Sequence, residues 1–157
     1  MSSDGPTRCP GNYEADMFVT YCEANEDFAE ETLNNALSSL GCRLRIQGRD
    51  FRPGASTFRD IVEAVQACRR TLVILSPQTV SSKWCMATVN LAAIESSHSS
   101  RPVLVFLALG AINASNLGAE LLFHIKNSMI FFFPPPENWR NERAMNLFWR
   151  RLYNAVR

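Results

Sequence analysis

The chain has 157 residues, of which 46% are hydrophobic and 20% are charged. This composition is typical of one globular domain and excludes a disordered or fibrous chain. A domain of this size buries about 70% of the surface of its unfolded chain and needs no disulfide or metal ion to fold. The net charge of +1 argues against bulk electrostatic binding to nucleic acid or to an anionic membrane.

No segment of the sequence has the pattern of a membrane span or a signal peptide. The longest uncharged apolar stretch, 103–112, is shorter than the roughly 18 residues that a spanning helix needs. Residues 1–12 lack an apolar core and are expected to form a flexible tail before a domain at 13–157. We expect a cytoplasmic domain that does not itself contact a membrane. Its cysteines have no CxxC spacing and are expected to be reduced and packed as small apolar groups: Cys9, Cys22, Cys42, Cys68 and Cys85.

Five times along the chain, a short apolar run precedes a stretch with helical periodicity, which is the alternation of βα units. The expected strands are 15–21, 42–47, 71–75, 103–109 and 129–133. The expected helices follow at about 25–40, 57–68, 82–97, 117–126 and 141–156. We expect Asn25 to cap the first helix, Gly41 to end it and Phe58 to face inward from the second.

The strand patterns also predict the order of the sheet. Apolar and polar residues alternate strictly over 42–47, which is typical of an edge strand with one wetted face. The run at 71–75 is apolar on both faces, as a central strand covered by helices must be. With right-handed crossovers, these patterns favour a doubly wound, five-stranded parallel sheet in an α/β fold, with strand order 2-1-3-4-5.

Most chemistries that such a fold supports are missing their residues. No GxGxxG or GxxxxGK[ST] motif is present, so the backbone cradles for dinucleotides and nucleoside triphosphates are absent. The third strand ends in Leu75, Ser76 and Pro77, where a phospho-acceptor domain needs an aspartate. His98 and His124 have no cysteine or carboxylate at metal-ligand spacing. We therefore expect no metal site and no cofactor.

The loop at 48–56 is the most unusual segment of the sequence. Pro53 and Gly54 suit the second and third positions of a type II turn over 52–55. An aromatic residue, Phe51, lies between arginines just before that turn. This combination is typical of a protruding contact site with an apolar anchor and orienting charges. An ordinary turn whose Phe51 packs back on the core explains the pattern equally well.

Three motifs make the chain resemble the Toll/interleukin-1 receptor (TIR) domain. The run DMFVTY at 16–21 is similar to the family's box 1, RDFRPG at 49–54 to its box 2, and Phe148 with Trp149 to the FW of its box 3. Ser76 and the run SKWC at 82–85 add support. The resemblance covers the chain from about Tyr13 to its end.

The resemblance implies a flavodoxin-like fold and a non-enzymatic protein interaction module. Such domains associate with other TIR domains, as cytoplasmic parts of receptors or as adaptors, to assemble innate-immune signalling complexes; a homo-oligomer or filament would fit. The box 2 loop, called the BB loop, is the implied protein-binding surface, with Arg49, Asp50, Phe51, Arg52, Pro53 and Gly54. The start of the third helix is the implied secondary interface, with Lys83, Trp84, Cys85 and Met86. Phe148 and Trp149 are interpreted as packing residues.

An enzymatic alternative comes from the same resemblance. Some TIR domains hydrolyse NAD, using a glutamate four residues after the tryptophan that opens the third helix. That position is Thr88 here, and a threonine cannot ionise to stabilise an oxocarbenium-like centre. Glu95 lies seven residues further along, about 10 Å of helical rise, and should face elsewhere. The sequence therefore favours the interaction module over a TIR-type NAD glycohydrolase.

Overall fold

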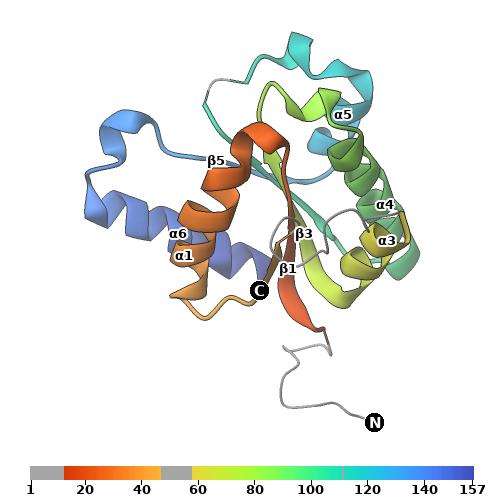
Figure 1. Ribbon diagram of the computed structural model, residues 1–157, viewed down its shortest axis with the longest axis horizontal. Coiled ribbons are helices and arrows are strands. Elements are labelled where there is room, and N and C mark those ends of the chain that lie inside the picture. Colours follow the sequence, from red (N-terminus) through yellow and green to blue (C-terminus); the bar gives the residue numbers. More distant parts are fainter. Residues whose placement is uncertain (1–12, 47–57, 111) are drawn as a thin grey trace.

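The computed structural model describes residues 13–46, 58–110 and 112–157, and these contain a five-stranded parallel sheet (Figure 1). The order of the strands is β2-β1-β3-β4-β5, and all neighbours run parallel. This confirms the predicted flavodoxin-like doubly wound sheet. The strands are β1 (Ala15–Thr20), β2 (Leu44–Ile46), β3 (Cys68–Leu75), β4 (Leu104–Ala108) and β5 (Met129–Phe132).

Helices cover both faces of the sheet (Figure 1). One face carries a π-helix (Phe28–Leu33), which continues as α1 (Asn34–Ser38), and α6 (Glu142–Val156). The other carries α3 (Phe58–Ala67), α4 (Lys83–Ser99) and α5 (Gly118–Lys126). No helix in the described ranges is long and apolar enough to cross a membrane. Short 3-10 turns lie at Glu23–Asn25, Thr79–Ser81, Ala114–Asn116 and Pro136–Asn138.

The sheet separates two hydrophobic clusters. Toward α3, α4 and α5 it buries Phe18 and Phe106, and toward α1 and α6 it buries Met17 and Leu107. All four side chains are fully buried. Because successive residues of a strand point to opposite faces, this two-sided burial explains the continuous apolar runs of the central strands.

The third strand begins earlier than the sequence predicted. Cys68 already pairs with Ala15, so Arg69 and Arg70 belong to β3 and not to the loop before it. Two arginines in a row argue against a buried strand. Here the strand tolerates them because they lie at its start, where the Arg70 guanidinium reaches the carbonyl oxygen of Val156 at 3.3 Å.

Two predicted helix details are wrong. Asn25 lies inside a 3-10 turn and caps no helix, because its side-chain oxygen is engaged by Ser76 and Cys22 instead. Phe58 is 70% exposed, since Ile61 and Val65 already occupy the buried face of α3. Gly41 does end the first helix, with the positive φ of 94° that favours glycine.

Candidate functional site

The first turn of α4 carries the residues predicted as a secondary interface. The Ser82 side chain caps the helix by accepting a hydrogen bond from the backbone N–H of Cys85 at 3.1 Å. Lys83 is exposed, while Trp84 and Met86 are half-buried against the core. Cys85 is fully buried. A partner could therefore touch Lys83 and the outer parts of Trp84 and Met86, but Cys85 only supports this surface from beneath.

The environment of Cys85 also excludes a role as a reactive thiol. Its Sγ lies 3.8 Å from the Thr20 hydroxyl, between β1 and α4. Burial raises the pKa of the Cys85 thiol, and the hydrogen bonds to Ser82 and Thr20 offset only part of that rise. The thiolate is the nucleophilic form of cysteine, so this side chain acts as a packed apolar group, as the sequence predicted.

The predicted BB-loop residues lie outside the described part of the chain: Arg49, Asp50, Phe51, Arg52, Pro53 and Gly54. The same holds for the predicted N-terminal tail at 1–12. The segment that contains the BB loop joins β2, which is an edge strand of the sheet, to α3. The role of the loop stays a prediction.

Box 1 and box 3 pack as the sequence predicted. Met17 and Val19 are fully buried in β1, and Trp149 is 7% exposed in α6. Phe148 is half-buried and its ring meets that of Trp149 edge-on at 5.1 Å. The sequence reasoning missed Asp16, whose carboxylate is buried and accepts a hydrogen bond from the backbone N–H of Arg43 at 2.9 Å. Its role is to join β1 to the start of β2.

Thr88, at the position where the resemblance implies a glutamate in NAD-hydrolysing domains, is part of the core. Its side chain is fully buried in α4. Its hydroxyl donates to the backbone carbonyl of Trp84 at 2.9 Å, within the same helix. The position therefore offers no ionisable group and no exposed hydroxyl.

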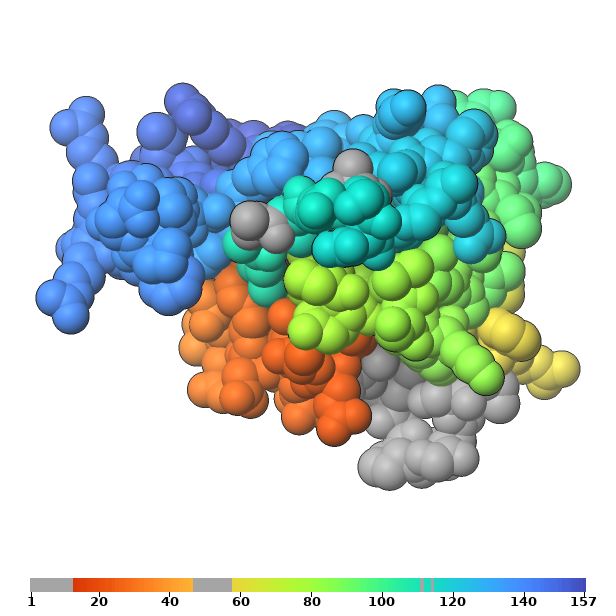
Figure 2. Space-filling view, turned by 90° about the horizontal axis from the view of Figure 1, so that it is seen from above, coloured from red at the N-terminus to blue at the C-terminus, as the bar shows by residue number. Residues whose placement is uncertain are grey.

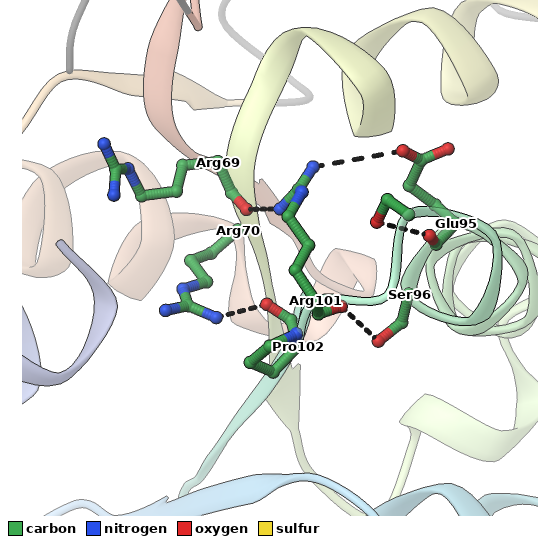
Figure 3. A network of polar contacts seen from close by, with 7 residues as sticks. Arg69, Arg70, Glu95, Ser96, Arg101 and Pro102 are labelled. Atoms are coloured by element: carbon green, nitrogen blue, oxygen red, sulfur yellow. Dashed lines mark hydrogen bonds and ion pairs between the residues drawn. The ribbon is translucent and has the colours of Figure 1, made fainter. Parts of the chain in front are cut away.

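Glu95 lies at the other end of α4 and is engaged there (Figure 3). Its carboxylate pairs with the Arg101 guanidinium at 4.0 Å. Arg101 also donates to the carbonyl of Arg69 and lies over the ring of Tyr13, with 4.8 Å between guanidinium carbon and ring centroid. Glu95 thus belongs to a structural network at the amino ends of β3 and β4, as expected from its distance from Thr88.

The same network holds a second arginine. Arg70 donates to the carbonyl oxygen of Pro102, which ties β3 to the start of β4 (Figure 3). It also donates to the carbonyl oxygen of Val156, at the end of α6. Burial lowers the pKa of Arg70, and the neighbouring charges of Arg101 and Arg69 lower it further. These arginines bind backbone oxygens and stabilise the end of the sheet.

A polar cluster at the opposite, carboxyl end of the sheet was not predicted. Ser76 follows β3 and is 3% exposed, and its hydroxyl donates to Asn25 Oδ1 at 2.8 Å. The thiol of Cys22, after β1, donates to the same oxygen at 2.9 Å. These contacts join the segments that leave two adjacent central strands. No local sequence pattern could predict the contact of Ser76, because it lies 51 residues from Asn25.

A family model described as the TIR domain matches residues 17–133, which is most of the chain. The chain belongs to the TIR domain family. The match begins at the second residue of box 1 and includes the BB loop and the whole of α4. Box 3 lies beyond its end.

Curated relatives of this TIR domain include Toll-like receptors. It is 26% identical over 149 residues to Toll-like receptor 4 of Pinctada imbricata, and 28% identical over 145 residues to Toll-like receptor 13 of Mus musculus. These alignments cover 93% and 90% of this chain but only 16% and 14% of the receptors. The comparison supports a signalling module. The chain spans only a small part of the length of these receptors.

Solved structures confirm the fold. The TIR domain of a Toll-related receptor from Hydra magnipapillata superposes with a TM-score of 0.64 at 20% identity, covering 90% of this chain and 98% of that one. A TIR-STING receptor from C. gigas, solved in complex with 2′,3′-cGAMP, gives a TM-score of 0.66 at 21% identity over 87% of this chain and 40% of its own. At this level of identity the likeness concerns the fold alone.

Proposed function

We propose that this TIR domain is a non-enzymatic interaction module that binds other TIR domains and assembles innate-immune signalling complexes in the cytoplasm. It would act as the cytoplasmic part of a receptor or as an adaptor. The Toll-like receptors named above support the signalling role, since the alignments with them cover nearly the whole of this chain. The principal contact would be the BB loop at 49–54, and the exposed first turn of α4 would contribute a second contact.

The observation that carries the non-enzymatic part of the proposal is the environment of Thr88. A carboxylate that stabilises a developing positive charge must reach the substrate. The side chain at this position is fully buried and bonded to its own helix. Glu95 does not replace it, because that carboxylate pairs with Arg101 at the opposite end of α4.

Partner capture tests the contact surface. Full-length chain carrying Pro53→His, or Phe51→Ala with Arg52→Glu, should capture TIR-domain partners at least tenfold less well than the wild type, because hot-spot residues dominate binding energy. Leu147→Ala with Arg140→Glu is a matched control, since both side chains are exposed and both residues are distant from the loop in sequence. Equal capture by all four proteins, at equal thermal stability, would refute the loop as the contact.

NAD turnover tests the enzymatic alternative. The wild-type domain is incubated with NAD at high protein concentration, and release of nicotinamide is followed by chromatography. We expect no release above the rate without protein. Saturable release of nicotinamide by the wild type, at a rate that Pro53→His leaves unchanged, would refute the non-enzymatic proposal and support a TIR-type NAD glycohydrolase.

A further inference from the structure

A cavity of about 820 Å³ opens at the carboxyl end of the sheet. The segments that follow β1, β3, β4 and β5 meet around it, and Figure 2 looks onto this end, where they are orange, yellow-green, teal and blue. The chain leaves β1 toward the face of α1 and leaves β3 toward the face of α4. Loops that diverge at such a switch point open the crevice in which α/β proteins bind ligands. The volume is typical of a small-molecule site.

The walls of the cavity are aromatic and held in place. Phe133 meets Phe28 edge-on at 5.0 Å and Phe148 edge-on at 5.5 Å, so its ring is fixed from two sides. Trp139 also lines the cavity, and its indole N–H donates to the carbonyl of Pro134 at 2.8 Å. Three consecutive prolines, 134–136, stiffen the segment between these rings. The cavity is therefore preformed for a flat apolar body.

The helical segment after β1 contributes side chains to the wall of the cavity. Phe28 and Thr32 both line it, and both belong to the π-helix Phe28–Leu33. A π-helical turn is rare and is frequently found at functional sites. The Tyr21 hydroxyl, at the end of β1, donates to Glu30 Oε2 at 2.5 Å and anchors this turn.

The polar groups around the cavity are neutral. Oδ1 of Asn25 accepts from both Ser76 and Cys22, which fixes the amide and leaves its Nδ2 donors for a ligand. Gln78 and Thr32 add a second amide and a hydroxyl. No lining side chain in the described part of the chain carries a formal charge. Among these described side chains an anionic ligand would gain no counter-charge to offset the loss of its hydration, which is unfavourable.

We propose that this cavity binds a neutral, planar heteroaromatic small molecule. Its ring would lie among Phe28, Phe133 and Trp139, and its polar edge would bind the Asn25 and Gln78 amides. The site is separate from the position of the family's catalytic glutamate, since Thr88 does not line it and lies in α4 on the opposite face of the sheet. Binding here would add ligand recognition to an interaction module without requiring catalysis.

The probe is adenine, a neutral heteroaromatic base, titrated into the ¹⁵N-labelled chain. A ligand of this size that fits the site binds with a Kd of about 1 mM or tighter. We expect saturable shifts of the amide signals of Asn25, Ser76 and Gln78. Thr32→Trp should weaken binding at least tenfold, because Thr32 is exposed at the rim and a larger side chain there fills the cavity. Asn35→Trp, one turn further on the exposed side of α1, should bind as the wild type does.

Several results would overturn the proposal. One is the absence of saturable shifts, or shifts confined to residues away from the cavity. Another is equal binding by Thr32→Trp and Asn35→Trp when thermal melts show both folded; if Thr32→Trp does not fold, Gln78→Trp from the opposite wall takes its place. Adenosine monophosphate that binds more tightly than adenosine would refute the neutral class of ligand. Partner capture is measured separately, so none of these results bears on the interaction module.

Discussion

Replacing Thr88 by glutamate introduces the residue type that the resemblance assigns to NAD-hydrolysing TIR domains, and it should destabilise this domain by about 2–6 kcal/mol. Thr88 is fully buried, and on its face of α4 it is flanked by Cys85, Val89 and Ala92, which are fully buried as well. Forcing a larger side chain into such packing costs about 1–3 kcal/mol. A buried carboxyl without a partner adds about 1–3 kcal/mol. For a domain of this length, the loss corresponds to a fall in Tm of about 4–24 °C.

Thermal unfolding followed by circular dichroism measures this effect against two controls. Thr88→Val keeps the shape and removes only the hydrogen bond to Trp84, so it should cost about 1 kcal/mol or less. Ile94→Glu places the same charge on the same helix at a side chain that is 64% exposed, and should change stability by about 0.5 kcal/mol at most.

The pH dependence of Thr88→Glu provides a second check on burial. Burial raises the pKa of the new carboxyl above that in the unfolded chain. The unfolded chain then loses its proton first as the pH rises, so the stability deficit should grow from pH 5 to pH 8 and shrink on acidification. A Tm within about 2 °C of the wild type at all pH values would refute the reasoning and show that position 88 is open to solvent.

Two further predictions follow from the contacts of α4. The pKa of Cys85 is raised above its ordinary value of 9.0, so this thiol ionises first in the unfolded chain, and the free energy of unfolding should fall as the pH rises above about 9. Cys85→Ser should reduce that fall when it is measured by denaturant titration. An equal fall in the variant and the wild type would contradict the raised pKa of Cys85. Arg101→Ala removes contacts with Glu95, Arg69 and Tyr13 and should cost about 1–2 kcal/mol. Glu95→Gln should cost less, about 0.5 kcal/mol, because its ion pair is long and partly exposed; equal losses in the two variants would show that the ion pair, and not the hydrogen bond to the backbone, stabilises this end.

The sheet could be predicted because its signals are local. Strict alternation around Leu44 and Ile46 indicates an edge, and the uninterrupted run from Thr71 to Leu75 indicates the centre, and the structure has them there. The start of β3 was missed because the charges of Arg69 and Arg70 outweigh any local strand signal. The acceptors of the Arg70 side chain, the carbonyl oxygens of Pro102 and Val156, are distant in sequence.

The cavity could not be predicted for the same reason. Phe133 and the prolines after it read as the end of a strand, and Asn25 reads as a helix cap. Only the fold shows that Phe133, the prolines and Asn25 line the same cavity as Ser76. The BB loop is the opposite case, since its motif is visible in the sequence and its residues lie outside the described ranges. Its role therefore depends on binding experiments.

The backbone around the cavity determines where ligand selectivity can come from. The carbonyls of Pro134, Pro135 and Pro136 already accept hydrogen bonds from Trp139 Nε1, the N–H of Asn138 and the N–H of Trp139. Prolines contribute no N–H. On this wall a ligand thus meets backbone carbonyls that already accept hydrogen bonds, and the Asn25 and Gln78 side chains offer it amide groups elsewhere in the cavity. Asn25→Leu should accordingly weaken binding of a hydrogen-bonding base more than binding of an apolar ring of the same size.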